Sequence, residues 1–208
     1  QMQDSGAAAI LVLENFAHTV QSVLADTQLK HVIVTGVGDL IPGIKGWAVN
    51  FVLRHVKRQV PDWTIPQAFR LKEILQEFEG RTPQPVELGH SDIAFLQYTG
   101  GTTGVAKGAM LSHGNMVANV LQAEAWFSQI ALDHATFYFA LPLYHIFSLT
   151  ANCLLGLRRG AVGILVPNPR DFHAFVKLLQ KEPPNCFLGV NTLFNALMNT
   201  PGFERIDF

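Results

Sequence analysis

The amino-acid sequence predicts an α/β protein with a mostly parallel β-sheet and flanking helices. Short runs rich in β-branched and aromatic residues alternate with stretches of helical periodicity, the pattern of repeated strand–helix–strand units. Hydrophobic residues make up 49% of the 208 residues and charged residues only 15%, so much of the chain suits an interior. A glycine-rich loop follows directly after one predicted strand.

The predicted elements follow from these periodicities. Strands are expected at residues 8–13, 31–35, 92–99, 136–142, 161–166 and 185–190, with a further strand after Lys107. Helices are expected at residues 16–25, 115–127, 146–157, 171–181 and 192–198. Asp171 follows the turn "PNPR" and is a good helix N-cap, whereas the prolines of "KEPPN" end that helix.

Between Pro42 and Leu88 the periodicity breaks down. Residues 45–58 form a basic amphipathic helix candidate, with Trp47 and Phe51 among its apolar residues. Such a helix lies either on an anionic membrane surface or on the protein surface with its cations extended into water. The connector "EGRTPQPVELGHSD" then leads into the glycine-rich segment.

Composition excludes several classes of function. The net charge of −1 gives no excess of positive charge for binding nucleic acid. Cys153 and Cys186 lack a CxxC partner, which suits reduced thiols in the cytoplasm. No secretory signal opens the chain. The apolar window at residues 135–156 is about long enough to span a bilayer, but Pro142 interrupts it, which favours a buried strand, turn and helix. The low charge also indicates a piece of a larger protein, the alternative being a domain with a poorly charged surface.

The segment "FLQYTGGTTGVAKGAMLSHGN" contains the strongest functional signal. Gly100, Gly101 and Gly104 leave backbone N–H groups free to converge on an anion. Short hydroxyl donors come from Thr99, Thr102 and Thr103, and Lys107 adds a cation that pairs well with phosphate. These residues predict a polyphosphate cradle, the alternative being a hairpin turn with an incidental lysine.

This loop differs from the common nucleotide-binding motifs. A Walker A loop ends in Gly-Lys-Ser/Thr and leads into a helix, whereas here Ala106 precedes Lys107, Gly108 follows it, and a strand is expected next. The glycine spacing also lacks the GxGxxG pattern of dinucleotide-binding folds.

The sequence "YTGGTTGVAKGAMLSHGN" resembles the phosphate-binding loop of the AMP-forming acyl-CoA synthetase, luciferase and peptide-synthetase adenylation superfamily. Ala106 replaces the proline of most members. Two further segments, "ALPLYHIFSLTANCLLGL" and "GVNTLFNAL", resemble family segments that follow the loop. Together with Asn191 in place of a proline, these similarities point to the long-chain fatty acid–CoA ligases of gammaproteobacteria. The resemblance implies that the chain is part of the large N-terminal domain of the adenylate-forming fold.

The resemblance implies a reaction in two steps. A fatty carboxylate attacks the α-phosphate of ATP to give acyl-AMP and pyrophosphate, and the thiol of coenzyme A then displaces AMP. Lys107 and His145 would be the catalytic residues, Mg²⁺ would arrive with ATP, and no metal would be held by protein ligands. The implied nucleotide-binding residues are Tyr98, Thr99, Gly100, Gly101, Thr102, Thr103, Gly104, Lys107 and Gly108. The implied acyl-binding residues are Tyr144, His145, Leu149 and Val190.

His145 follows a predicted strand and a proline, where a side chain emerges at the carboxyl edge of a sheet. The resemblance places it beside the acyl carboxylate, where it would orient rather than act as a base. The alternative is a core histidine bonded to the backbone. For Tyr144, Leu149 and Val190, the alternative is that each packs in the hydrophobic core and does not line an acyl site.

The expected organisation is a first subregion with connector at residues 1–90 and a phosphate-loop and acyl-binding subregion at residues 91–208. The family's adenine, ribose, hinge and C-terminal lysine segments are absent, so we expect the isolated chain to be inactive. Alternatives are a non-catalytic nucleotide- or acyl-binding module and an adenylating ligase for another carboxylate. We expect a cytoplasmic protein with no nucleic-acid partner, and the sequence leaves peripheral inner-membrane contact and a homodimer open.

Overall fold

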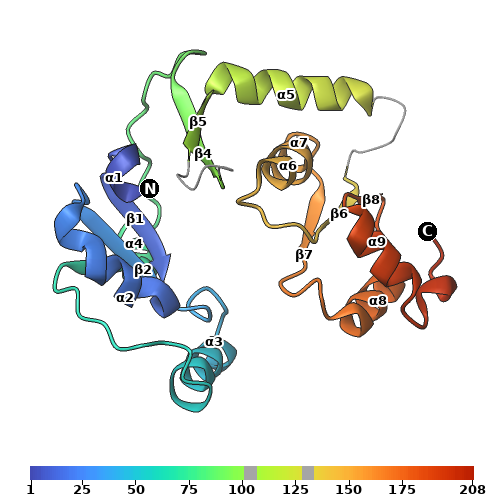
Figure 1. The fold of residues 1–208 in the computed structure, drawn as a ribbon, viewed down its shortest axis with the longest axis horizontal. Coiled ribbons are helices and arrows are strands. Elements are labelled where there is room, and N and C mark those ends of the chain that lie inside the picture. The colour runs from blue at the N-terminus through green and yellow to red at the C-terminus, as the bar shows by residue number, and fades with distance from the viewer. Residues whose placement is uncertain (101–106, 128–133) are drawn as a thin grey trace. The chain divides into compact units, whose positions relative to one another are not determined.

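The computed structural model describes residues 1–100, 107–127 and 134–208. The chain divides into two compact units, one of residues 1–87 and 98–108 and the other of residues 88–97 and 109–208. Strands and helices alternate in both units (Figure 1). The predicted α/β class with parallel strands is therefore confirmed, with the parallel strands divided between two three-stranded sheets.

The first unit is built on the parallel sheet β1-β2-β3, in which Ala9 pairs with His31 and Val32 pairs with Ala68. Its core contains Ala17, Val20, Val32, Val34 and Ile65. The elements are α1 (Met2–Ser5), β1 (Ala9–Leu13), α2 (Glu14–Val23), η1 (Leu24–Asp26), β2 (His31–Thr35), α3 (Ile44–Phe51), η2 (Val52–Val56), β3 (Ala68–Arg70) and α4 (Leu71–Glu77).

The sequence located most of these elements. The strand at 31–35 is confirmed, the strand at 8–13 begins one residue later, and the helix expected at 16–25 begins at Glu14 and ends at Val23. The helix expected at 45–58 is confirmed as α3 followed by the π-helical turn η2. Strand β3 and helix α4 were not predicted, because three and seven residues are too short to establish a period.

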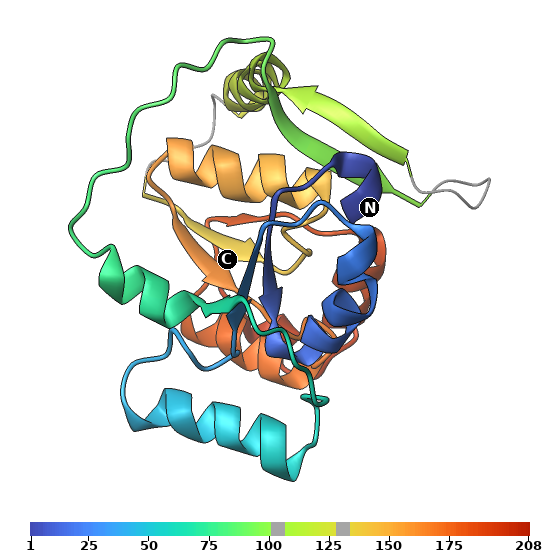
Figure 2. The ribbon, with the colours of Figure 1, turned by 90° about the vertical axis from the view of Figure 1, so that its left-hand side faces the viewer.

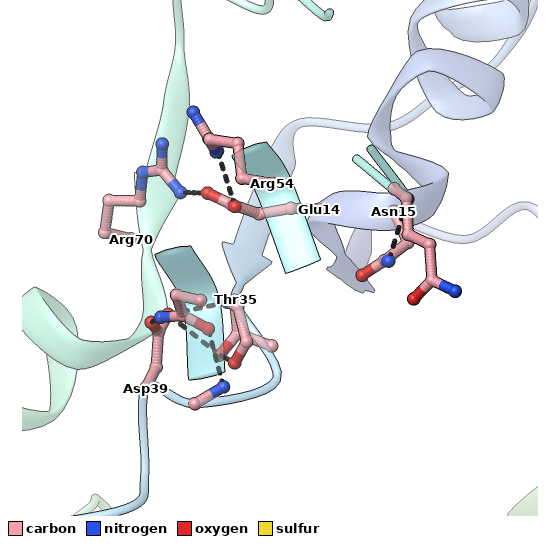
Figure 3. Close-up of polar contacts among 10 residues, drawn as sticks. Glu14, Asn15, Thr35, Asp39, Arg54 and Arg70 are labelled. Atoms are coloured by element: carbon pink, nitrogen blue, oxygen red, sulfur yellow. Dashed lines mark hydrogen bonds and ion pairs between the residues drawn. The ribbon is translucent and has the colours of Figure 1, made fainter. Parts of the chain in front are cut away.

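Polar side chains attach α2 and α3 to the carboxyl ends of the strands (Figure 3). Asp39 accepts hydrogen bonds from the Gly36 N–H, the Thr35 hydroxyl and the side-chain amide of Asn50 on α3. Glu14, which is buried at the start of α2, pairs with Arg54 of η2 and Arg70 of β3. The two ion pairs join residues 40 and 56 positions apart in the sequence.

The second unit holds the parallel sheet β7-β6-β8 and most of the pair β4-β5. The elements are β4 (Ile93–Thr99), β5 (Lys107–Ser112), α5 (His113–Trp126), β6 (Thr136–Phe139), α6 (Ile146–Ser148), η3 (Leu149–Leu154), α7 (Leu155–Arg158), β7 (Val162–Leu165), α8 (Phe172–Lys181), β8 (Cys186–Phe187), α9 (Asn191–Met198) and η4 (Phe203–Arg205).

Helices cover both faces of the β6 sheet (Figures 1 and 2). Successive side chains of a strand point to opposite faces. Phe137 accordingly packs with Val120 of α5 and Leu155 of α7, whereas Tyr138 packs with residues of α8 and α9. The Tyr138 hydroxyl donates to the Glu182 carbonyl at 2.6 Å, and burial is the first cause that raises its pKa. The sheet is therefore a layer between two sets of helices.

Several predicted boundaries were wrong. The strand expected at 136–142 ends at Phe139, and a turn follows in which the His145 N–H donates to the Pro142 carbonyl. The strand expected at 185–190 contains only Cys186 and Phe187. The helix expected at 146–157 runs through α6, η3 and α7 with a π-helical centre, so residues 135–156 form the predicted strand, turn and helix.

The first residues of helices α5 and α8 are determined by their N-cap residues. The helix expected at 115–127 begins at His113, because Ser112 and Asn115 form a reciprocal capping box. The predicted N-cap Asp171 is confirmed, since its carboxylate accepts a hydrogen bond from the Ala174 N–H. Helix α8 ends at Lys181, before the two prolines.

Candidate functional site

Strand β4 leads into the glycine-rich loop, and β5 leads out of it. The predicted strand end at Thr99 and the strand after Lys107 are both confirmed. Thr99, Gly100 and Lys107 are exposed. Gly101, Thr102, Thr103 and Gly104 lie outside the described residues. The described part therefore places the two arms of the predicted cradle and leaves its centre as a prediction.

Tyr98 and Gly108 lie against each other where the two arms pair. A Cβ atom on Gly108 would meet the Tyr98 ring at 3.0 Å, so a larger residue would require the ring to shift by a few tenths of an ångström. The Tyr98 hydroxyl donates a hydrogen bond to the Asp4 carboxylate at 2.5 Å. That bond is the first cause that raises the Tyr98 pKa, followed by desolvation and the negative charge of Asp4. Both residues thus have packing roles at the base of the loop, and their contact with a nucleotide stays a prediction.

Lys107 is the first residue of β5. Its side chain is exposed, and among the described residues no carboxylate forms an ion pair with it. At Gly100, no described atom lies within 4 Å of the position that a Cβ would take. Open space at Gly100 and an exposed cation at Lys107 suit an anionic ligand.

His145 is the N-cap of α6. It is exposed, and its Nδ1 accepts a hydrogen bond from the Phe147 N–H at 3.3 Å. This bond requires a lone pair on Nδ1, so in the neutral ring the proton is on Nε2, which is then the hydrogen-bond donor. The alternative of a core histidine was wrong, because the ring is bonded to the backbone but is not buried.

Gln97 connects β4 to the turn that contains His145. The side-chain amide of Gln97 donates to the Tyr144 carbonyl at 2.8 Å, across 47 residues of sequence. On the other side of the turn, the Ser148 hydroxyl donates to the Leu141 carbonyl at 3.0 Å. The strand that enters the loop and the segment that presents His145 are therefore joined. Sequence reasoning missed Gln97, since a single polar residue in a strand has no distinguishing spacing.

In the described part of the chain, one of the predicted acyl-binding residues lines a groove. Val190 lines a groove of about 560 Å³ together with Leu141, Pro142 and Leu193. A separate groove of about 610 Å³ is lined by residues of β5, α5 and the α6–η3 helix, including Phe147 and Thr150. Tyr144, which is 81% exposed, and the half-buried Leu149 line neither groove in the described part of the chain.

Sequence reasoning did not predict an apolar groove of about 430 Å³ that the structure contains. It lies between β4, α5 and the η3–α7 helix, with Phe95, Met116 and Val120 among its lining residues. The available signal was the spacing of Met116, Val117, Val120 and Leu121, which places apolar side chains on neighbouring turns of α5. Arg158, which lines the groove, and Arg159 donate hydrogen bonds to Glu124, and these bonds are the leading causes that lower the pKa of Glu124.

Two further features concern metals and membranes. Among the described residues, no group of three or more histidine, cysteine, aspartate or glutamate side chains is arranged to hold a metal ion. Within the same residues, no helix has the length and apolarity needed to cross a bilayer.

Comparison with known proteins adds the family. A sequence profile described as AMP-binding enzyme matches residues 1–207. The chain belongs to this family of AMP-binding enzymes. The resemblance predicted from the loop and its two following segments is thereby confirmed, and the match extends over nearly the whole chain.

Two relatives show how this AMP-binding chain compares in sequence. It is 50% identical over 212 aligned residues to a long-chain-fatty-acid–CoA ligase of Haemophilus influenzae, covering 100% of this chain and 38% of that protein. It is 48% identical over 209 aligned residues to a long-chain-fatty-acid–CoA ligase of Salmonella typhimurium, and the match covers 100% of this chain and 37% of that protein. The chain thus spans little more than a third of the length of these relatives.

A solved structure supports the fold. The crystal structure of the anthranilate CoA ligase AuaEII in complex with anthranoyl-AMP matches with a TM-score of 0.72 at 19% identity. The match covers 99% of this chain and 35% of that one. At this identity the likeness concerns the fold alone.

Proposed function

We propose that the protein containing this chain is a long-chain fatty acid–CoA ligase. Its reaction would be the ATP-dependent activation of a fatty acid to acyl-AMP and pyrophosphate, followed by transfer of the acyl group to coenzyme A. The observation that carries this proposal is the 50% identity to the Haemophilus influenzae ligase over the full length of the chain. The joined positions of the loop strand and the His145 turn support it.

The loop would carry the electrostatic part of the first step. Adenylation brings a carboxylate to an anionic phosphate and leaves negative charge on the departing pyrophosphate. Positioned N–H groups and a cation stabilise such charge without rearranging in the transition state. We assign the β- and γ-phosphates to the backbone of residues 100–104 with the hydroxyls of Thr99, Thr102 and Thr103, and we assign Lys107 to the leaving charge.

His145 would orient the acyl carboxylate. Its Nδ1 accepts a hydrogen bond from the Phe147 N–H, so Nε2 is the ring nitrogen available for a carboxylate oxygen. A fixed donor of this kind contributes by limiting the orientations of the reactants. Tyr144, Leu149 and Val190 complete the proposed acyl site, although Val190 lies in a groove that Tyr144 does not line.

Several finer points belong to the same proposal. Mg²⁺ would enter with the phosphates of ATP, to which it commonly binds in phosphoryl-transfer sites. Coenzyme A is the proposed acyl acceptor. We also propose cytoplasmic location with peripheral contact to the inner membrane, and homodimer formation. The 208 residues alone are proposed to be inactive, because they span little more than a third of the length of the matched ligases.

Fatty-acid-dependent exchange of pyrophosphate into ATP tests the proposal on the full-length protein. We expect exchange with long-chain fatty acids, and thioester formation when coenzyme A is added. A chain-length series with benzoate, anthranilate and amino acids as further substrates separates the alternatives. Exchange with only an aromatic or amino acid substrate would indicate another adenylating ligase. Nucleotide binding without any exchange would indicate a non-catalytic binding module.

A further inference from the structure

The helix formed by α3 and η2 is attached to the first unit by its small and polar side. Gly46 is buried, and a Cβ added to it would lie 2.3 Å from the Gly38 carbonyl oxygen. One turn further, Asn50 donates to Asp39 and accepts from the Gly38 N–H, both at 2.7 Å. Another turn on, Arg54 pairs with Glu14 (Figure 3). Residues spaced by four lie along one side of a helix, so these contacts define the inward stripe.

The opposite side of this helix is apolar and exposed. Ile44 is 80% exposed, Trp47 65% and Val56 67%, and Phe51 and Val52 are also exposed. We call these five residues the Trp47 face. The rings of Trp47 and Phe51 stack with centroids 5.3 Å apart, and Phe51 contacts the His55 ring at 4.9 Å. An amphipathic helix usually turns its apolar side to the core, and here that orientation is reversed.

Positive charge surrounds the Trp47 face. Residues 40–61 contain no aspartate or glutamate, whereas they contain Lys45, Arg54, Lys57 and Arg58. Arg54 is paired with Glu14. Lys45, Lys57 and Arg58 are exposed, and no described carboxylate forms an ion pair with any of them. An exposed aromatic face with basic flanks matches helices that lie in the interface of an anionic bilayer.

The positive charge around the Trp47 face also argues against a second molecule of this protein packing on that face. In a two-fold symmetric dimer the same patch meets itself, so the basic flanks would be brought together. Like charges placed opposite each other at an interface are strongly unfavourable. An anionic lipid surface instead offers the complementary charge together with an apolar layer.

We propose that the Trp47 face docks the protein on a bilayer that carries anionic phospholipid headgroups. The helix lies parallel to the membrane, with Trp47 and Phe51 at the boundary between headgroups and acyl chains and with Lys45, Lys57 and Arg58 near the phosphates. Its 8 and 5 residues measure about 20 Å, too short to cross a bilayer. This makes specific the membrane contact in the proposed function and rests on that part alone, so exchange activity can succeed or fail independently.

Vesicle flotation with the full-length protein tests the docking surface. The vesicles are phosphatidylcholine alone and phosphatidylcholine mixed with phosphatidylglycerol. We expect binding to the mixed vesicles that weakens with added salt. Trp47→Ala/Phe51→Ala should weaken it at least about tenfold. Lys45→Gln/Lys57→Gln should weaken it about fivefold per lysine on the mixed vesicles and much less on neutral ones.

A matched control separates this face from exposed aromatic surface in general. Phe16 and Phe78 are similarly exposed aromatic residues of the same unit outside α3 and η2. Phe16→Ala/Phe78→Ala should leave flotation unchanged. The proposal is overturned if the wild type does not bind the mixed vesicles, or if the Trp47 and control variants bind alike. If light scattering shows that Trp47→Ala/Phe51→Ala changes the oligomeric mass while flotation is unaltered, a second copy covers the face and the lipid assignment is wrong.

Discussion

The side-chain amide of Gln97 donates a hydrogen bond to the Tyr144 carbonyl at 2.8 Å. Gln97 lies near the end of β4, just before the glycine-rich loop, and Tyr144 precedes His145 in the turn after β6. Within the second unit, this bond thus links strand β4 with the segment proposed to orient the carboxylate. Because the proposed adenylation requires the carboxylate and the phosphate in a fixed geometry, we predict a positioning role for Gln97.

Gln97→Leu should therefore affect turnover more than stability. We expect a loss of about 1 kcal/mol in the free energy of unfolding, typical of one hydrogen bond. The maximal rate of pyrophosphate exchange should fall about tenfold through misalignment. Gln180 donates to the Gly202 carbonyl at the same distance of 2.8 Å and supplies the control. Gln180→Leu should lower stability similarly without changing exchange, and equal exchange rates in the two variants would contradict the positioning role.

Sequence reasoning found the elements whose signals are local. The strand at 31–35 and the end of β4 at Thr99 follow from runs of β-forming residues, and the N-cap Asp171 follows from a turn. Strand β3, with three residues, was not predicted, and β8 contains only two of the residues expected at 185–190. The extent of both strands depends on pairing to neighbouring strands, which no short pattern encodes.

For a related reason, only some parts of the candidate site could be proposed from the sequence. Glycines, threonines and a lysine in one short segment carry their chemistry in their order, so the loop was visible in the sequence. Gln97 acquires its role only through a contact 47 residues away. The amphipathic pattern at 45–58 revealed a helix, but the direction of its apolar side depends on Gly38, Asp39 and Glu14, which lie outside it.

Lys107→Ala should slow adenylation in the full-length protein. Removing one positioned cation from a site of developing charge typically costs about 100-fold to 1,000-fold in rate. Lys107→Arg should retain part of the rate, because it keeps the charge with a different geometry. The measurement is fatty-acid-dependent pyrophosphate exchange, with Lys72→Ala as an exposed lysine control. An exchange rate unchanged in Lys107→Ala would refute the role given to Lys107.

Gly46→Ala should loosen α3 from the first unit. The added Cβ would lie 2.3 Å from the carbonyl oxygens of Gly38 and Ile41, and both are backbone atoms that move only with their segments. We expect a loss of about 2 kcal/mol in the free energy of unfolding, although alanine favours a helix more than glycine does. Hydrogen exchange of the amides of residues 44–56 should accelerate.

Gly89→Ala supplies the control for this substitution. The nearest described atom to a Cβ at Gly89 is Asp92 Oδ2 at 3.6 Å, an ordinary contact. Its effect on the free energy of unfolding should stay within about 0.5 kcal/mol. If both variants leave the protection of residues 44–56 unchanged, the close approach of Gly38 and Gly46 does not hold the helix in place.

Ionisation of Tyr98 should lower the free energy of unfolding at alkaline pH. Its hydrogen bond to Asp4, together with desolvation and the Asp4 charge, raises the pKa of Tyr98 above the ordinary value. The folded state therefore holds the phenolic proton more tightly than the unfolded state does. The resulting stabilisation is complete below the ordinary tyrosine pKa of about 10 and is lost as the pH rises through the raised pKa.

Tyr98→Phe removes this proton but keeps the ring against Gly108. We expect the variant to be less stable than the wild type at neutral pH and to lose less stability as the pH rises from about 9 to 11. Chemical denaturation at each pH measures both effects. Tyr144→Phe is the matched control, because Tyr144 is 81% exposed and its hydroxyl forms no hydrogen bond within the described residues. If Tyr98→Phe retains the wild-type slope while Tyr144→Phe loses it, the alkaline dependence arises from Tyr144 and the bond to Asp4 does not set it.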